Sequence, residues 1–223
     1  MKPLSWRRRI DAEAVLSDRN KRMIWRIAAL LLDYPTAETC LLIDQLTSAA
    51  DELPDPLRTH LTDFLSDFCA LEPTARATRY VETFDMRRRA SLHLTYYAYG
   101  DTRKRGMALL RFKHAYRQAG SAIGDGELPD YLPLVLEFAA TIDHVRGERL
   151  LAEHVPVLEL LRISLQDSGS AYRDLLAAVL ATLPPISTAD RRRIAELAAQ
   201  GPPDEDVGLD PFVPDPLATG VRR

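Results

Sequence analysis

The chain has 223 residues, and its 29 basic side chains against 32 acidic ones give a formal net charge of -3. A chain of this length folds most often as one domain around one sizeable core. Its near-neutral charge argues against a protein that binds nucleic acid, or an acidic membrane surface, through a general positive field. Cys40 and Cys69 lie far apart, with no CxxC pair, which favours free thiols over a disulfide or a metal site.

The two ends of the chain differ in composition from its middle. Residues 1–17 include the basic run Arg7 to Arg9 and no sustained apolar period, which predicts a flexible basic tail. Residues 201–223 hold five prolines and several acids, which predicts a Pro-rich, disordered tail. The basic start lacks the apolar core of a signal peptide, and no apolar run approaches the ~20 residues of a membrane span. We therefore expect a cytoplasmic protein, without membrane insertion, whose residues 18–200 form one helical domain.

Apolar residues recur at helical spacing through most of residues 18–200. Ile24, Ile27, Ala28 and Leu31 mark one face of a helix that ends before Pro35. Comparable faces predict further helices, which begin at Thr36, Leu57, Thr74, Met86, Asp101, Asp130, Glu148 and Ser170, with a short last helix around Ile194 and Leu197. No segment alternates apolar and polar residues as a strand does. The sequence therefore predicts an all-α, single-domain bundle of about nine to ten helices and no sheet.

Three local features of these helices carry specific expectations. Asp130 is expected to be the N-cap of its helix, with Pro133 in the first turn. Gly147 is expected to mark a break before a long helix over residues 148–166. The run Arg87 to Arg89 is expected to begin a helix over residues 86–99, where the helix dipole opposes positive charge. The run is therefore either a solvated basic face or a site that recognises acidic groups.

The chain lacks the short motifs that would indicate an enzyme. It contains no phosphate-binding loop, no GxGxxG after a strand, no HExxH and no GxSxG. The glycines of residues 120–126 follow no strand, which favours a connector over a phosphate site. His144 and His154 would point roughly 80° apart on one continuous helix, and the other histidines are isolated, so no metal site is expected.

The strongest candidates for a binding site lie between residues 79 and 138. The acidic, proline-containing helix start at residues 127–133 follows a glycine-rich loop, which is typical of the rim of a groove for a partner's amphipathic helix. An ordinary capped helix start would give the same pattern. Tyr96, Tyr97 and Tyr99 could form a binding platform, although such tyrosines are more often core residues.

Three segments resemble a known family when they are taken together. They are YVETFD at residues 80–85, LHLTYYAYGDTRKRGMALLRFKHAYRQAG at 92–120 and ELPDYLPLVLEFAA at 127–140. They resemble the nitrate reductase molybdenum cofactor assembly chaperones, which form the NarJ subfamily of the TorD/DmsD redox-enzyme maturation proteins. The resemblance covers about residues 20–183.

The resemblance implies an all-helical cytoplasmic chaperone of the TorD/DmsD type and not an enzyme. Such a chaperone binds the N-terminal segment of the apo catalytic (alpha) subunit of respiratory nitrate reductase, enables insertion of the molybdenum cofactor into that subunit, and delays its docking to the membrane. The resemblance further implies no stably bound cofactor and either a monomer or a helix-swapped dimer. A helical adaptor, or a nucleotide-hydrolysing helical enzyme, remains the alternative.

The resemblance also implies which residues contact the client peptide. Carried over residue by residue, it points first to the acidic helix start, at Glu127, Pro129, Asp130 and Tyr131. The wider TorD/DmsD family usually has histidine where this chain has Tyr131, so no role that needs an imidazole is expected there. A second group is expected to line the same groove, namely Tyr80, Phe84, Asp85, His93 and Tyr97.

Overall fold

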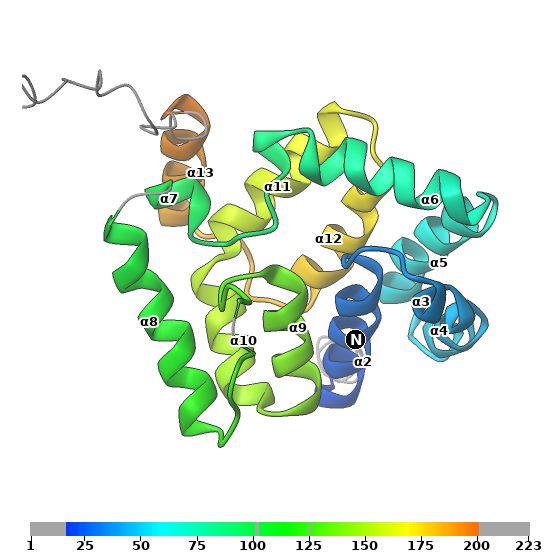
Figure 1. Cartoon of the computed structure of the whole chain (residues 1–223), viewed down its shortest axis with the longest axis horizontal. Helices are drawn as coiled ribbons and strands as arrows, with labels where there is room; N and C mark the ends of the chain where they lie inside the picture. The colour runs from blue at the N-terminus through cyan, green and yellow to red at the C-terminus, as the bar shows by residue number, and fades with distance from the viewer. Residues whose placement is uncertain (1–16, 101–102, 125, 201–223) are drawn as a thin grey trace, which may run out of the picture.

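The computed structural model describes residues 17–100, 103–124 and 126–200, and Figure 1 shows its ribbon. Within these residues it holds twelve α-helices, one π-helical turn and one 3-10 turn, and it has no strand. The all-α prediction is therefore confirmed. The two tails predicted from the sequence lie outside the described residues, apart from Ser17. None of the described helices combines the length and the apolarity needed to cross a membrane.

The N-terminal part of the chain forms four helices, α2 (Asp18–Leu31), α3 (Ala37–Leu41), α4 (Ile43–Asp51) and α5 (Asp55–Cys69). The side chain of Thr36 accepts a hydrogen bond from the backbone N–H of Thr39, so Thr36 caps α3 as predicted. The single helix predicted after Thr36 is divided at Leu42, which ends α3 and begins α4.

The core is built around α9 (Leu132–Thr141), α11 (Val155–Asp167) and α12 (Tyr172–Ala181). Helix α2 packs along α9, and α12 packs against α2, α5 and α11 (Figure 1). The buried indole N–H of Trp25 donates to the hydroxyl of Thr182 at 2.8 Å, which satisfies both polar groups inside the core. Both cysteines are free.

The remaining helices are α6 (Pro73–Tyr80), α7 (Tyr96–Tyr99), α8 (Arg103–Gln118), α10 (His144–Glu153) and α13 (Thr188–Gln200). In Figure 1, α8 runs along the outside of the molecule. Tyr97 of α7 and Leu197 of α13 line the same pocket. The ring of Tyr116 on α8 contacts the ring of Phe138 on α9 at 4.6 Å, and both side chains are buried.

The predicted helix over residues 86–99 does not form. Instead, α6 continues as a π-helical turn at Val81–Asp85, a 3-10 turn follows at Arg88–Ala90, and only Tyr96–Tyr99 are α-helical. Between the 3-10 turn and α7, the backbone of residues 92–94 pairs with that of residues 130–132. The Leu94 N–H donates to the carbonyl of Asp130 at 3.0 Å, and the Leu132 N–H donates to the carbonyl of Leu92 at 2.8 Å. The arginine run is therefore at a turn, and not at a helix start.

The long helix predicted over residues 148–166 is also two helices, but the break is not at Gly147. The chain divides at His154, which ends α10 and precedes α11. Pro156 is in the first turn of α11, where its missing N–H loses no bond, but it could not stand inside one continuous helix. Gly147 lies inside α10, where it allows a close approach: a Cβ there would lie 2.3 Å from both the Cα and the Cβ of Ala139.

We expect Gly147→Ala to lower the free energy of unfolding by about 1–3 kcal/mol, because the added methyl group would push α10 away from α9. The matched control is Gly106→Ala in α8, where no atom lies within 4 Å of the added Cβ; it should stabilise the chain by about 0.5–1 kcal/mol through helix propensity. Urea unfolding followed by circular dichroism measures both. Equal effects of the two substitutions would contradict the close approach.

Candidate functional site

An open pocket of about 290 Å³ lies where the π-helical turn, the segment after it and the start of α9 meet. Ten residues line it: Tyr80, Phe84, Asp85, Arg87, Arg88, Ser91, Leu92, His93, Tyr96 and Tyr131. Five of the nine residues predicted to contact a client are among them, although they come from three separate segments of the chain. We call this space the aromatic pocket.

The π-helical turn shapes one wall of the aromatic pocket. The N–H of Met86 donates to the carbonyl of Val81 at 3.0 Å, five residues back, so the turn holds one residue more than an α-helical turn. Phe84 then faces inward and is 7% exposed, whereas Asp85 is exposed at the rim. Single π-helical turns of this kind are frequent at functional sites.

Phe84 belongs to a cluster of aromatic rings beneath the pocket. The centre of its ring lies 4.9 Å from the ring centre of Tyr80 and 4.7 Å from that of Tyr172, which is fully buried in α12. The ring of Tyr34 meets Tyr80 edge-on at 5.5 Å. Offset and edge-on pairs of this kind contribute about 0.5–1.5 kcal/mol each beyond their buried area. The aromatic wall is therefore fixed from below and not only by its own segment.

Tyr131 joins the pocket to the end of α2 through its hydroxyl group. This hydroxyl donates to Asp33 at 3.0 Å and lies 3.1 Å from the hydroxyl of Tyr80. Because a hydroxyl carries one hydrogen, Tyr80 must be the donor to Tyr131. Burial raises the pKa of Tyr80 to about 12, against the opposing effect of its bond to Tyr131, and burial also raises the pKa of Tyr131. Both tyrosines are therefore neutral hydrogen-bonding groups at ordinary pH.

Asp130 is not the N-cap that the sequence predicts. Tyr131 occupies the N-cap position of α9 without a side-chain cap, and the carboxylate of Asp130 is turned inward and fully buried. It accepts hydrogen bonds from the backbone N–H of Thr95 at 3.0 Å and from the Thr95 hydroxyl at 2.5 Å. The carboxylate is therefore a buried anchor for the segment that carries Thr95, and not part of an exposed acidic rim.

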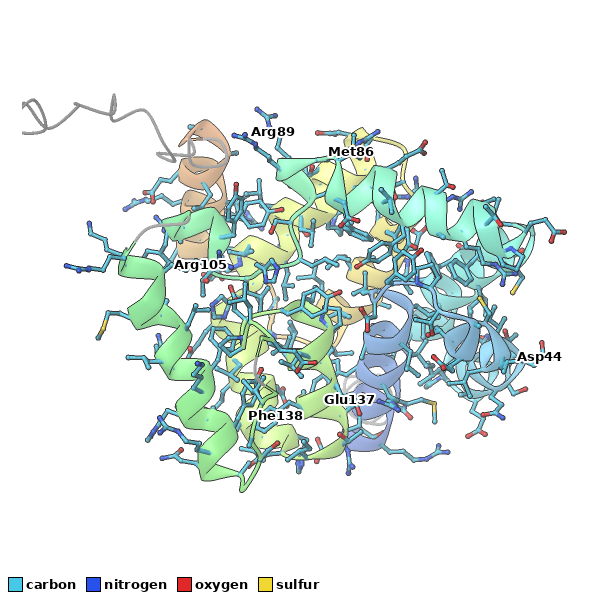
Figure 2. The ribbon with its side chains drawn as sticks, viewed as in Figure 1. Asp44, Met86, Arg89, Arg105, Glu137 and Phe138 are labelled. Atoms are coloured by element: carbon cyan, nitrogen blue, oxygen red, sulfur yellow. The ribbon has the colours of Figure 1, made fainter. Side chains whose placement is uncertain are left out.

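Two basic side chains complete the surroundings of this carboxylate. His93 Nδ1 lies 3.5 Å from one oxygen, and Arg105 Nη2 lies 3.6 Å from the other. Arg105 projects from the start of α8 toward the interior (Figure 2), and its Nε also donates to the Thr95 hydroxyl at 3.2 Å. We call Asp130, Thr95, His93 and Arg105 the Asp130 cluster. It brings together three segments of the chain around one buried charge.

The Asp130 cluster holds the carboxylate in its ionised form. Burial alone would raise the pKa of Asp130, but the nearby His93 ring and the hydrogen bonds from Thr95 outweigh that effect and lower the pKa to about 2. His93 has a second contact, because its ring lies 5.4 Å from that of Tyr131 and the two residues form an isolated antiparallel bridge. His93 therefore links the buried charge to the surface of the aromatic pocket.

The other predicted site residues lie outside the aromatic pocket. Pro129 is buried, and its carbonyl accepts a hydrogen bond from Tyr116 at 2.8 Å. Glu127 is exposed in the loop before α9. Tyr97 is buried, its hydroxyl donates to the carbonyl of Arg89 at 2.9 Å, and its ring lines a neighbouring pocket. The structure thus separates the predicted set into pocket-lining, buried and loop residues.

Sequence reasoning missed three residues on which the site depends, namely Asp33, Thr95 and Arg105. Asp33 and Arg105 carry no local signal, because their partners are distant in sequence. Thr95 carries none either, because it is buried against the carboxylate of Asp130, 35 residues later in the sequence. No three potential metal ligands come together within the part of the chain that the structure describes.

Comparisons with known proteins match the region that builds the site. A family model described as "Nitrate reductase delta subunit" matches residues 50–178, which is more than half of the chain. The "Probable nitrate reductase molybdenum cofactor assembly chaperone NarJ" of Bacillus subtilis is 30% identical over 169 residues, which are 75% of this chain and 92% of that protein. The chain belongs to the nitrate reductase delta subunit family.

Two further relatives differ in how much of their length is matched. The "Nitrate reductase molybdenum cofactor assembly chaperone NarJ" of Escherichia coli K12 is 32% identical over 157 residues, which are 69% of this chain and 66% of that protein. The "Nitrate reductase-like protein NarX" of Mycobacterium tuberculosis is 40% identical over 161 residues. The chain spans 24% of the length of that second protein.

The family match covers most of the site but not all of it. The π-helical turn, the Asp130 cluster and α9 all fall within residues 50–178, whereas Asp33 lies before them. The buried charge and the pocket-lining rings therefore lie within the residues that the family model matches. The partner of the Tyr131 hydroxyl comes from the part of the chain that precedes the family match.

We expect Asp130→Ala to lower the free energy of unfolding by about 3–5 kcal/mol, because it leaves Arg105 and Thr95 without their buried acceptor. The loss of an N-cap alone would cost about 1 kcal/mol. Urea unfolding distinguishes the two values. The control is the exposed acid of the same loop, Glu127→Ala, which should change stability by less than about 0.5 kcal/mol. A loss near 1 kcal/mol for Asp130→Ala would restore the capping interpretation.

The lowered pKa of Asp130 also predicts a dependence on pH. Its pKa falls from 3.8 to about 2 on folding, so the unfolded chain binds the proton more tightly and stability rises with pH across this range. The contribution, about 2 kcal/mol, is complete above pH ~5 and disappears as the pH falls toward 2. Asp130→Asn should therefore show a smaller loss of stability than the unchanged chain between pH 5 and 2.5. Parallel losses in both proteins would show that Asp130 does not titrate in this way.

Proposed function

We propose that this chain is a chaperone, and not an enzyme, that assembles a respiratory nitrate reductase. It binds the N-terminal segment of the apo catalytic subunit and keeps that subunit open while the molybdenum cofactor is inserted. The observation that carries the proposal is the convergence of Tyr80, Phe84, Asp85, His93 and Tyr131 on one open pocket. The family and the names of its relatives in Bacillus and Escherichia supply the class of client.

The chemistry of the aromatic pocket suits a segment of amphipathic peptide. Its floor is aromatic, with Phe84 and Tyr80 held from below and Tyr96 partly exposed at the side. One part of its rim carries the acid Asp85, and another carries Arg87 and Arg88. A peptide with apolar residues on one face and charges on the other would bury the first and pair the second, as amphipathic helices do in grooves.

The remaining residues named from the resemblance have different roles in this proposal, and not all of them touch the client. Asp130 and Pro129 are positioning residues, because they fix the segment that carries His93 and the start of α9 without reaching the surface. Glu127 is exposed, and it is available to pair with a basic side chain of a longer client segment. Tyr97 supports the turn that carries the arginines, through its bond to Arg89.

Binding in this pocket explains how one contact serves two steps of assembly. While the client's N-terminal segment is held by the chaperone, that segment is not available to the membrane partner of the enzyme, so docking waits for release. The cofactor belongs to the client in this proposal, and the chaperone holds no cofactor of its own. The place of action is the cytoplasm, where the apo subunit is made.

We expect a synthetic peptide of the client's N-terminal segment to bind the full chain with a negative heat-capacity change, because apolar surface is buried. Asp85→Lys and Tyr96→Ala should each weaken binding by roughly tenfold, which corresponds to about 1.4 kcal/mol. Isothermal titration calorimetry measures both quantities. The control for Asp85→Lys is Asp44→Lys on α4, an exposed acid at the far right of Figure 2, which should leave the affinity unchanged.

Two results would contradict the proposal. Peptide affinity that is the same in the Asp85→Lys, Tyr96→Ala and Asp44→Lys proteins would place the client away from the aromatic pocket. A strain that lacks this chain, but whose nitrate reductase still holds its full content of molybdenum, would contradict the assembly function itself.

A further inference from the structure

A second and larger pocket, of about 640 Å³, lies on the other side of the arginine run. Its walls are the 3-10 turn at Arg88–Ala90, helix α11 and helix α13. Leu160, Ile163, Leu197 and the ring of Tyr97 give it an apolar surface. We call it the arginine pocket, because Arg87, Arg88 and Arg89 all line it.

The arginine pocket has an excess of positive charge. Three arginines line it, and the one acid among its lining residues is Asp167. The arginine side chains are exposed, and Figure 2 shows Arg89 directed outward from the ribbon. Their backbone is fixed, because the carbonyl of Arg89 accepts the hydrogen bond from the buried Tyr97. A short turn thus holds three like charges beside an apolar surface, an arrangement that an acidic segment with apolar residues would complement.

The chain itself continues from this pocket into such a segment. Leu197 and Ala198 line the pocket, and α13 ends at Gln200. The sequence that follows is GPPDEDVGLDPFV, and residues 201–215 contain five acids and no basic residue. Val207, Leu209, Phe212 and Val213 are interspersed with these acids. Both the charge and the apolar residues of this stretch match the two surfaces of the pocket.

The chain after Gln200 is also long enough for its acidic residues to reach the arginine pocket. An extended chain advances ~3.3–3.6 Å per residue, so Asp204 to Asp206 can lie roughly 13–22 Å from Gln200. A space of 640 Å³ is on the order of 9 Å across, within the size range of ligand pockets. The prolines at positions 202, 203 and 211 restrict the backbone before docking, which lowers the entropy lost on ordering.

We propose that residues 204–213 dock on the arginine pocket of the same chain. Asp204 and Asp206 pair with the exposed arginines of the turn, and Val207 and Leu209 cover the apolar wall formed by α11 and α13. The docked segment then braces the turn from outside. Because Arg87 and Arg88 line both pockets, it also fixes one wall of the aromatic pocket.

Hydrogen exchange of the full chain, followed by mass spectrometry, tests this contact without removing any part of the protein. We expect the amides of residues 204–213 to exchange at least about tenfold more slowly than in a free peptide of the same sequence. Arg87→Glu with Arg89→Glu should abolish this protection. Adding Asp204→Lys and Asp206→Lys to that protein should restore it, because the charges are then exchanged between the two sides.

The control variant is Arg191→Glu with Arg192→Glu, two exposed arginines of α13 that do not line the pocket. It should leave the protection of residues 204–213 unchanged. Free-peptide exchange rates in the unmodified chain would overturn the proposal, and so would equal protection in the Arg87→Glu, Arg89→Glu protein. Protection that disappears on dilution would show that a second copy of the chain occupies the pocket, and it would overturn docking within one chain.

Discussion

The buried carboxylate of Asp130 constrains everything around the aromatic pocket. A charge that is fully removed from water requires hydrogen bonds and opposite charge within a few ångströms. Here they come from Thr95, His93 and Arg105, which lie in two other segments of the chain. The segment of residues 91–95, the start of α8 and the start of α9 are therefore held together by one group. Without that group, Arg105 would lose the acid that balances its charge inside the molecule.

Tyr131, which follows Asp130 in the chain, faces the aromatic pocket and not the interior. Asp130 ends the turn before α9 and Tyr131 is the N-cap residue of that helix, and here Asp130 faces inward while Tyr131 lines the pocket. The Leu132 N–H then returns to the carbonyl of Leu92, so three consecutive residues serve the interior, the pocket and the backbone pairing in turn. A shift of one residue in this pairing would place a tyrosine in the core and a carboxylate at the aromatic wall. The buried charge therefore also fixes the register of the pocket.

Most helices could be predicted from the sequence because their signals are local. The apolar period of residues 24–31 and the cap at Thr36 act within a few residues, and both predictions hold. The prediction of a helix over residues 86–99 was wrong because Leu92, Tyr96 and Tyr99 have helical spacing, yet the backbone of Leu92 and Leu94 pairs with that of Leu132 and Asp130, which lie beyond α8 in the sequence. The prediction that Asp130 is an N-cap was wrong for the same reason. Its sequence context is that of an N-cap, but Thr95 and Arg105 are better partners for its carboxylate, and both are visible only after folding.

The same holds for the site. Its aromatic residues could be named from the sequence, whereas the residues that hold them in place, such as Asp33, could not. The hydroxyl of Tyr131 is oriented by Asp33, 98 residues earlier and outside the region that the family model matches. Asp33 lies two residues after the end of α2, and α2 is held by the burial of Trp25 and by its packing along α9. The orientation of a pocket-lining tyrosine therefore depends on the docking of the N-terminal helix. A fragment limited to residues 50–178 would lack α2, the ring of Tyr34 and Asp33, so the Tyr131 hydroxyl would lose its acceptor and the aromatic wall one of its supports.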